Sequence, residues 1–103
     1  MTDFDSALAQ FLTHVARMVE APYAVGSIAP DVLEHTVGRR YVRVFKDPHG
    51  SPSGRSVYCF VDRKDGTVLK PAGWKGPAKG SWGSVYDPSS WARMSRYGVG
   101  YLR

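Results

Sequence analysis

Apolar residues recur at helical spacing through the first twenty positions of the chain, while polar and charged residues take the opposite side. Thr2 followed by Asp5 is typical of a helix start, and Pro22 favours an end because the residue before a proline avoids the α region. The pattern therefore predicts an amphipathic helix at about residues 3–20. Its apolar stripe consists of Phe4, Leu8, Phe11, Leu12, Val15, Met18 and Val19.

A second, shorter helix is expected directly after the first segment. Pro30 and Asp31 are suited to a first helical turn, and Gly38 is suited to the position that follows a last turn. These signals predict a short helix that ends at Val37 and turns its valine and leucine side chains inward.

Three runs rich in β-branched and aromatic residues follow and are typical of strands. The middle run is apolar on both faces, so we expect it to be the central strand. The three strands are predicted to form an antiparallel β-meander, with the N-terminal helix packed on one face of it. The runs are RYVRVFK (40–46), SVYCFVD (56–62) and TVLK (67–70), joined by a loop at 47–55 and a turn at 62–66.

The character of the chain changes after Pro71. Residues 71–90 are rich in glycine and proline but contain two tryptophans, which indicates an ordered wrapping loop without regular structure. A short C-terminal helix is expected from about Asp87 to Arg96, with a last edge strand after it. The predicted fold is thus α+β in a single domain, 1–103. An acidic helical head (1–38) precedes a basic, aromatic β body (39–103).

Composition narrows the function classes. The chain has 103 residues, 43% of them hydrophobic, and one cysteine, which suits a small packed domain and excludes a disulfide framework within the chain. No apolar run is long enough to span a bilayer, and the N-terminus lacks the basic region of a signal peptide. We therefore expect a soluble cytoplasmic protein with no membrane partner.

Charge is distributed unevenly along the chain. Residues 1–35 carry one basic and five acidic side chains, whereas residues 36–103 carry thirteen basic and four acidic ones. Such asymmetry favours a polyanionic partner. The alternative is a charged surface that keeps the protein in solution and an attraction between its two parts.

Part of the sequence resembles a group of small, uncharacterised proteins encoded by tailed bacteriophages. The resemblance covers about half of the chain and implies a phage origin and action in the host cytoplasm, but no particular activity. It is carried by SVYCFVD (56–62), Gly66, VLK (68–70), Trp74-Lys75, Pro77-Ala78-Lys79 and YLR (101–103).

No combination of residues predicts catalysis, a metal site or a cofactor. Cys59 alternates with valines on a strand, so a buried, unreactive thiol is expected. The three histidines fall in different predicted elements without ligand spacing. In GWKGPAKGSWGS, Lys79 precedes Gly80, which is the reverse of the order in a phosphate-binding loop. We expect a protein that is not an enzyme.

Basic residues interleaved with aromatic ones remain as the candidate functional feature. Cationic side chains neutralise phosphates and flat rings stack bases, so this composition is typical of surfaces that bind single-stranded nucleic acid, whether DNA or RNA. The predicted nucleic-acid-binding residues are Arg40, Arg43, Lys70, Trp74, Lys75, Lys79, Trp82, Arg93 and Arg96.

Two other interpretations stay open for the same residues. Trp74 and Trp82 can instead anchor an irregular loop to the core. Exposed Trp, Tyr and Arg are also the favoured anchors of protein interfaces, so a host protein is the alternative partner.

Overall fold

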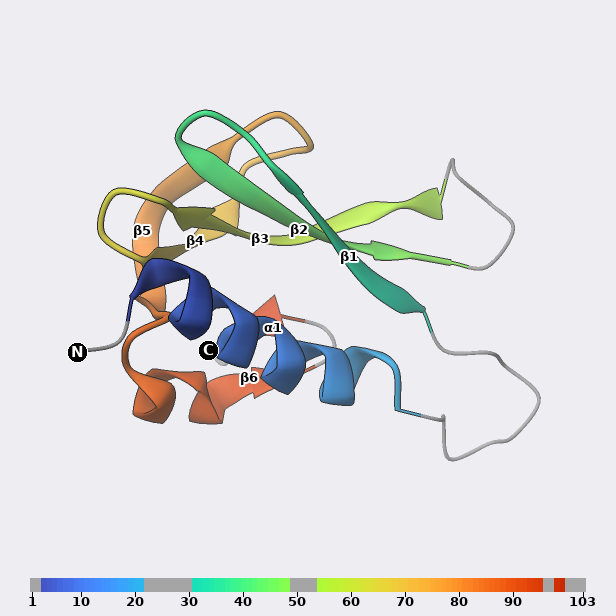
Figure 1. Ribbon diagram of the computed structural model, residues 1–103. Coiled ribbons are helices and arrows are strands. Elements are labelled where there is room, and N and C mark those ends of the chain that lie inside the picture. The colour runs from blue at the N-terminus through green and yellow to red at the C-terminus, as the bar shows by residue number, and fades with distance from the viewer. Residues whose placement is uncertain (1–2, 22–30, 49–53, 96–97, 100–103) are drawn as a thin grey trace.

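The protein is α+β, with one helix packed against a five-stranded antiparallel sheet (Figure 1). The computed structural model describes residues 3–21, 31–48, 54–95 and 98–99. The strands pair in chain order, so the sheet is a continuous meander. Its elements are α1 (Phe4–Val19), β1 (Val32–Val37), β2 (Tyr41–Asp47), β3 (Ser56–Asp62), β4 (Thr67–Pro71) and β5 (Pro77–Ser84), followed by the 3-10 helix η2 (Pro88–Arg93) and the short pair β6 (Met94–Ser95) and β7 (Gly98–Val99).

Helix α1 confirms the predicted amphipathic helix. Its cap is Asp3, whose carboxylate accepts a hydrogen bond of 2.8 Å from the Ser6 backbone N–H. The predicted cap, Thr2, lies outside the described residues. At the other end, Glu20 accepts a hydrogen bond of 2.9 Å from the Leu33 backbone N–H, which fixes the end of α1 to β1.

The core lies between α1 and the sheet face that α1 covers. Strand β3 is central and is buried from Tyr58 to Asp62, as its two apolar faces predicted. Cys59 is fully buried there, as expected. The core residues include Ala7, Leu8, Phe11, Val15 and Val19 from α1, together with Val42, Val44, Tyr58, Cys59, Val61, Val68, Val85, Trp91 and Met94.

The prediction of a three-stranded meander is wrong, first because the expected helix before Gly38 is strand β1. All six residues of β1 pair with β2, from Val32 opposite Asp47 to Val37 opposite Val42. Gly38 turns the hairpin, and its N–H donates to the Tyr41 carbonyl at 2.9 Å. The local cap signals suited a helix, but backbone pairing with a formed neighbouring strand decides the conformation of so short a segment.

The meander prediction also fails at the other edge, where the expected wrapping loop contains strand β5. Pro77 begins this strand, which is the position a sheet edge tolerates for proline. Gly80 and Gly83 have positive φ angles, and the pairing with β4 is irregular on both sides of Leu69. Intrinsic propensity is poor here, and pairing with β4 overrides it.

The predicted C-terminal helix up to Arg96 is also corrected. A six-residue 3-10 helix ends at Arg93 and β6 follows at once, while Arg96 lies outside the described residues. Within η2 the indole N–H of Trp91 donates to the Ser84 carbonyl at 2.9 Å, and its ring meets Phe11 edge-on at 5.5 Å between centroids. These contacts attach the end of β5 and η2 to α1. In the part of the chain that is described, no helix is long and apolar enough to cross a membrane.

Candidate nucleic-acid interface

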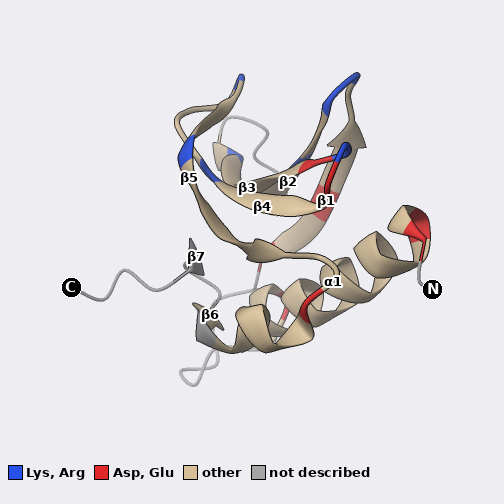
Figure 2. Ribbon diagram, turned by 90° about the vertical axis from the view of Figure 1, so that its left-hand side faces the viewer, with Lys and Arg blue, Asp and Glu red and all other residues tan. Residues whose placement is uncertain are grey.

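The candidate site is a hollow on the sheet face that points away from α1. Figure 2 shows the β1–β2 turn and the β4–β5 turn rising from the sheet on that side, with Lys and Arg positions at their tips. The hollow between them has a volume of about 360 Å³. It is lined by Thr36, Val37, Gly38, Arg39, Arg40, Tyr41, Arg43, Phe60 and Lys75.

The floor of the hollow is formed by Tyr41 and Arg43, which are alternate residues of β2, and by Phe60 on β3. Tyr41 and Arg43 share one face of β2 because strand side chains alternate, and Arg43 is directly opposite Phe60. The rings of Tyr41 and Phe60 meet edge to face at 6.2 Å between centroids. Phe60 is 2% exposed, so packing within the sheet fixes the position of this floor.

Arg43 ties the β4–β5 turn to the sheet. Its guanidinium lies 4.9 Å from the ring centroid of Trp74 and 6.0 Å from that of Phe60. Its Nε donates a hydrogen bond of 2.8 Å to the Trp74 carbonyl, and Nη1 donates one of 3.3 Å to Thr36 Oγ1. This planar set of donors and ring contacts places the residue after Trp74, Lys75, at the rim of the hollow.

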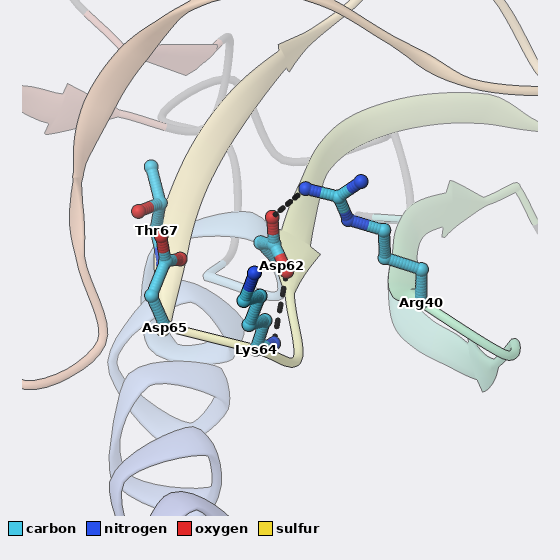
Figure 3. A network of polar contacts seen from close by, with 5 residues as sticks. All are labelled: Arg40, Asp62, Lys64, Asp65 and Thr67. Carbon is cyan, nitrogen blue, oxygen red and sulfur yellow. Dashed lines mark hydrogen bonds and ion pairs between the residues drawn. The ribbon is translucent and has the colours of Figure 1, made fainter.

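A buried carboxylate holds Arg40 beside the hollow (Figure 3). Asp62 is 5% exposed and accepts from Arg40 Nη2 at 3.1 Å through Oδ2 and from the Lys64 backbone N–H at 2.8 Å through Oδ1. The hydrogen bond to Asp62 raises the pKa of Arg40 above its ordinary value. Arg40 also lies over the ring of Tyr41, at 5.3 Å from its centroid.

The β3–β4 turn is joined to the β1–β2 turn by hydrogen bonds from Arg63 to backbone carbonyls. The Arg63 N–H donates to the Arg40 carbonyl at 2.8 Å, and Arg63 Nη1 donates to the carbonyls of Gly38 at 2.7 Å and Arg39 at 3.2 Å. Beyond Lys64, Asp65 accepts from the Thr67 N–H at 2.9 Å. Hydrogen bonding with Thr67, through its side chain first and its backbone second, lowers the pKa of Asp65. The two turns therefore form one bonded unit.

A second hollow, of about 390 Å³, lies at the β1–β2 and β3–β4 turns and adjoins the first hollow. None of the described residues that line either hollow is acidic. Arg39 and Arg40 line both hollows, so the two form one continuous cationic surface, here called the cationic track. The cations of the track are Arg39, Arg40, Arg43, Arg63, Lys64 and Lys75.

Three of the predicted binding residues meet in the first hollow: Arg40, Arg43 and Lys75. Trp74 lies on the far side of Arg43, where it is 41% exposed and packs at 5.2 Å from the ring of Phe45.

Lys79 does not line the first hollow. It lines another hollow, which shares Arg40 with the first and also contains Asp62 and Asp65, so that two carboxylates offset the cations there.

The other predicted binding residues are not brought to the track. Lys70 is exposed on β4 but lines neither hollow. Trp82 is partly buried and packs against the core, which agrees with the alternative interpretation of Trp82 as an anchor. Arg93 belongs to η2, on the far side of β5 from the track, and its side chain is not among those described. Arg96 lies outside the described residues.

Sequence reasoning missed half of the cations in the track. Arg39, Arg63 and Lys64 stand in turns, and turn residues were interpreted as connections only. A signal was available, since the motifs GRR and DRKDG place paired basic residues at two turns. Their proximity depends on β1, whose strand character was not predicted.

The described residues hold no group of three or more His, Cys, Asp or Glu side chains placed to bind a metal ion. Burial raises the pKa of the Cys59 thiol above its ordinary value, which disfavours the nucleophilic thiolate.

Comparison with known proteins places the chain by its sequence. A family model described as a family of unknown function, DUF7717, matches residues 7–98, which is most of the chain. The chain belongs to this family. The matched residues run from within α1 through the whole sheet and η2. No curated protein and no solved structure matches the chain significantly.

Proposed function

We propose that the protein is a non-enzymatic nucleic-acid-binding protein and that the cationic track is its binding surface. The observation that carries the proposal is the first hollow, where Arg39, Arg40, Arg43 and Lys75 converge beside Tyr41 and Phe60 without an acidic residue among the described lining. Hydrogen bonds hold two of these cations in place, Arg40 to the Asp62 carboxylate and Arg43 to the Trp74 carbonyl. Clustered, oriented cations of this kind bind phosphates.

The test is binding of a fluorescein-labelled 20-nucleotide single strand, followed by fluorescence anisotropy at low salt. Arg39→Glu and Lys75→Glu each place a carboxylate in the first hollow, and each is expected to weaken binding by about tenfold or more. Lys70→Glu is the matched control because it makes the same charge change at an exposed position outside both hollows. Equal losses for all three variants would mean that net charge alone is sensed, and no binding by the wild type would reject the proposal.

A protein partner is the second candidate, favoured by apolar side chains that remain exposed. Val37 is 60% exposed at the rim of the hollow, and Trp74 and Tyr86 are 41% and 46% exposed. Aromatic and arginine side chains together are typical of interface anchors. A partner that is captured from nuclease-treated host lysate and released by Trp74→Ala, but not by Lys75→Glu, would favour this function over nucleic-acid binding.

We further propose a phage origin and action in the cytoplasm of a bacterial host. The support is the resemblance of residues 56–103 to small phage proteins. Expression in bacteria followed by fractionation tests the location, and recovery in the membrane fraction would contradict it.

A further inference from the structure

We propose that the cationic track recognises the phosphodiester backbone of a nucleic-acid strand and not its bases. This inference rests on the proposed function and specifies which part of the nucleic acid the surface contacts. It follows from two observations: the six cations line two adjoining hollows, and the rings on the floor of the first hollow are already in contact with arginines.

The rings of the hollow have little free face for a base. Tyr41 has the Arg40 guanidinium at 5.3 Å from its centroid and the edge contact with Phe60, and Phe60 is 2% exposed beneath Arg43 at 6.0 Å. Base stacking needs an open ring face. In this hollow the rings instead orient guanidinium groups, which bind phosphate oxygens through paired N–H donors.

The extent of the track indicates a polymer. Lys75 and Arg43 lie at one end, Arg63 and Lys64 line only the second hollow, and Arg39 and Arg40 join the two. A single phosphate can be held by one hollow. A chain of phosphates can occupy both at once, and each cation that neutralises a phosphate releases a counterion.

The hallmark of such binding is its dependence on salt and not on sequence. With all six cations engaged, the slope of log K against log salt for a single strand is expected to be about −4. The double variant Arg39→Glu/Lys75→Glu should reduce the size of this slope by about 1.4 or more, because two contacts are lost. Lys70→Glu should leave it unchanged.

The deciding experiment compares a 20-nucleotide DNA single strand, RNA of the same sequence, and a DNA oligomer of the same length in which the central ten positions are abasic. All three are expected to bind the wild-type protein within about threefold of one another. A tenfold or greater loss with the abasic oligomer would overturn the inference and would leave nucleic-acid binding standing with base stacking, for instance on Trp74. Failure of all three to bind would instead reject the proposed function itself.

Discussion

At the scale of single residues, Arg43 combines structural contacts with a place in the hollow. Its guanidinium lies over the rings of Phe60 and Trp74. It also donates hydrogen bonds to the Trp74 carbonyl and to Thr36. Sequence reasoning singled out Arg43 as a binding residue from its neighbours on one strand. It could not foresee these contacts, because Trp74 comes from a segment without a predicted strand.

Replacement of Arg43 by lysine keeps the charge and removes the planar donor set. We expect Arg43→Lys to lower the free energy of unfolding by about 1–2 kcal/mol. The position of the β4–β5 turn should also change. Urea denaturation measures the first effect and tryptophan fluorescence of the native state reports the second. Arg17→Lys on the exposed side of α1 is the control, and equal stabilities for the two variants would contradict the role assigned to Arg43.

Cys59 should be inert in the folded protein. It is fully buried in β3, and burial raises the pKa of its thiol. We expect no reaction with a thiol reagent such as DTNB under native conditions and full reaction in urea. Cys59→Ser should cost about 1–3 kcal/mol of stability, because a hydroxyl replaces the thiol in the apolar core. Rapid native labelling, or a stable variant that no longer binds nucleic acid, would indicate a thiol function.

At the scale of elements, local sequence predicted those parts whose pattern is strong and failed where pairing decides. Helix α1 and strands β2 to β4 carry clear periodicity, so their positions were foreseen. Strand β1 is exposed over most of its length, and β5 is rich in glycine, so neither shows an apolar alternation. Both lie at sheet edges, where hydrogen bonds to one neighbour suffice to hold a strand.

The β3–β4 turn depends on the glycine that sequence reasoning placed in a left-handed conformation. Gly66 has φ of 77°, and a Cβ there would lie 2.5 Å from the ring of Tyr86. We expect Gly66→Ala to destabilise the protein by about 1–3 kcal/mol, through both strain and overlap.

The control for this substitution is Gly76→Ala, since a Cβ at Gly76 meets no atom within 4 Å. Thermal unfolding of the two variants side by side is the measurement. Equal melting temperatures would show that the turn relaxes without cost. A specific loss at Gly66 should also weaken nucleic-acid binding, because this turn carries Arg63 and Lys64.

At the scale of the whole molecule, the acids at the ends of α1 and the cationic track lie on opposite sides of the sheet. Asp3, Asp5 and Glu20 lie in or next to α1, whereas the track lies on the other face, where Asp62 and Asp65 stand beside its cations. The uneven charge along the chain therefore becomes a partial separation of charge in space. A field of this kind orients an approaching polyanion toward the track before contact.

The whole domain should unfold as one unit, because α1, the sheet and η2 share a core. Phe11 is fully buried and contacts Trp91. We expect Phe11→Ala to cost about 3–5 kcal/mol, and the milder Phe11→Leu to cost less. For each variant that folds, circular dichroism and tryptophan fluorescence should report the same urea midpoint. A separate, earlier fluorescence change would show that η2 detaches before the sheet unfolds.

The bonded pair of turns has a consequence for the kinetics of recognition. Because Arg63 holds the carbonyls of Gly38 and Arg39, and Asp62 holds Arg40, folding itself has already restricted much of the freedom of these long side chains. An incoming ligand then has little left to immobilise, and less of its interaction energy is spent on ordering the protein. Capture should consequently proceed at a rate governed by diffusion and ionic strength, without a slow rearrangement after first contact.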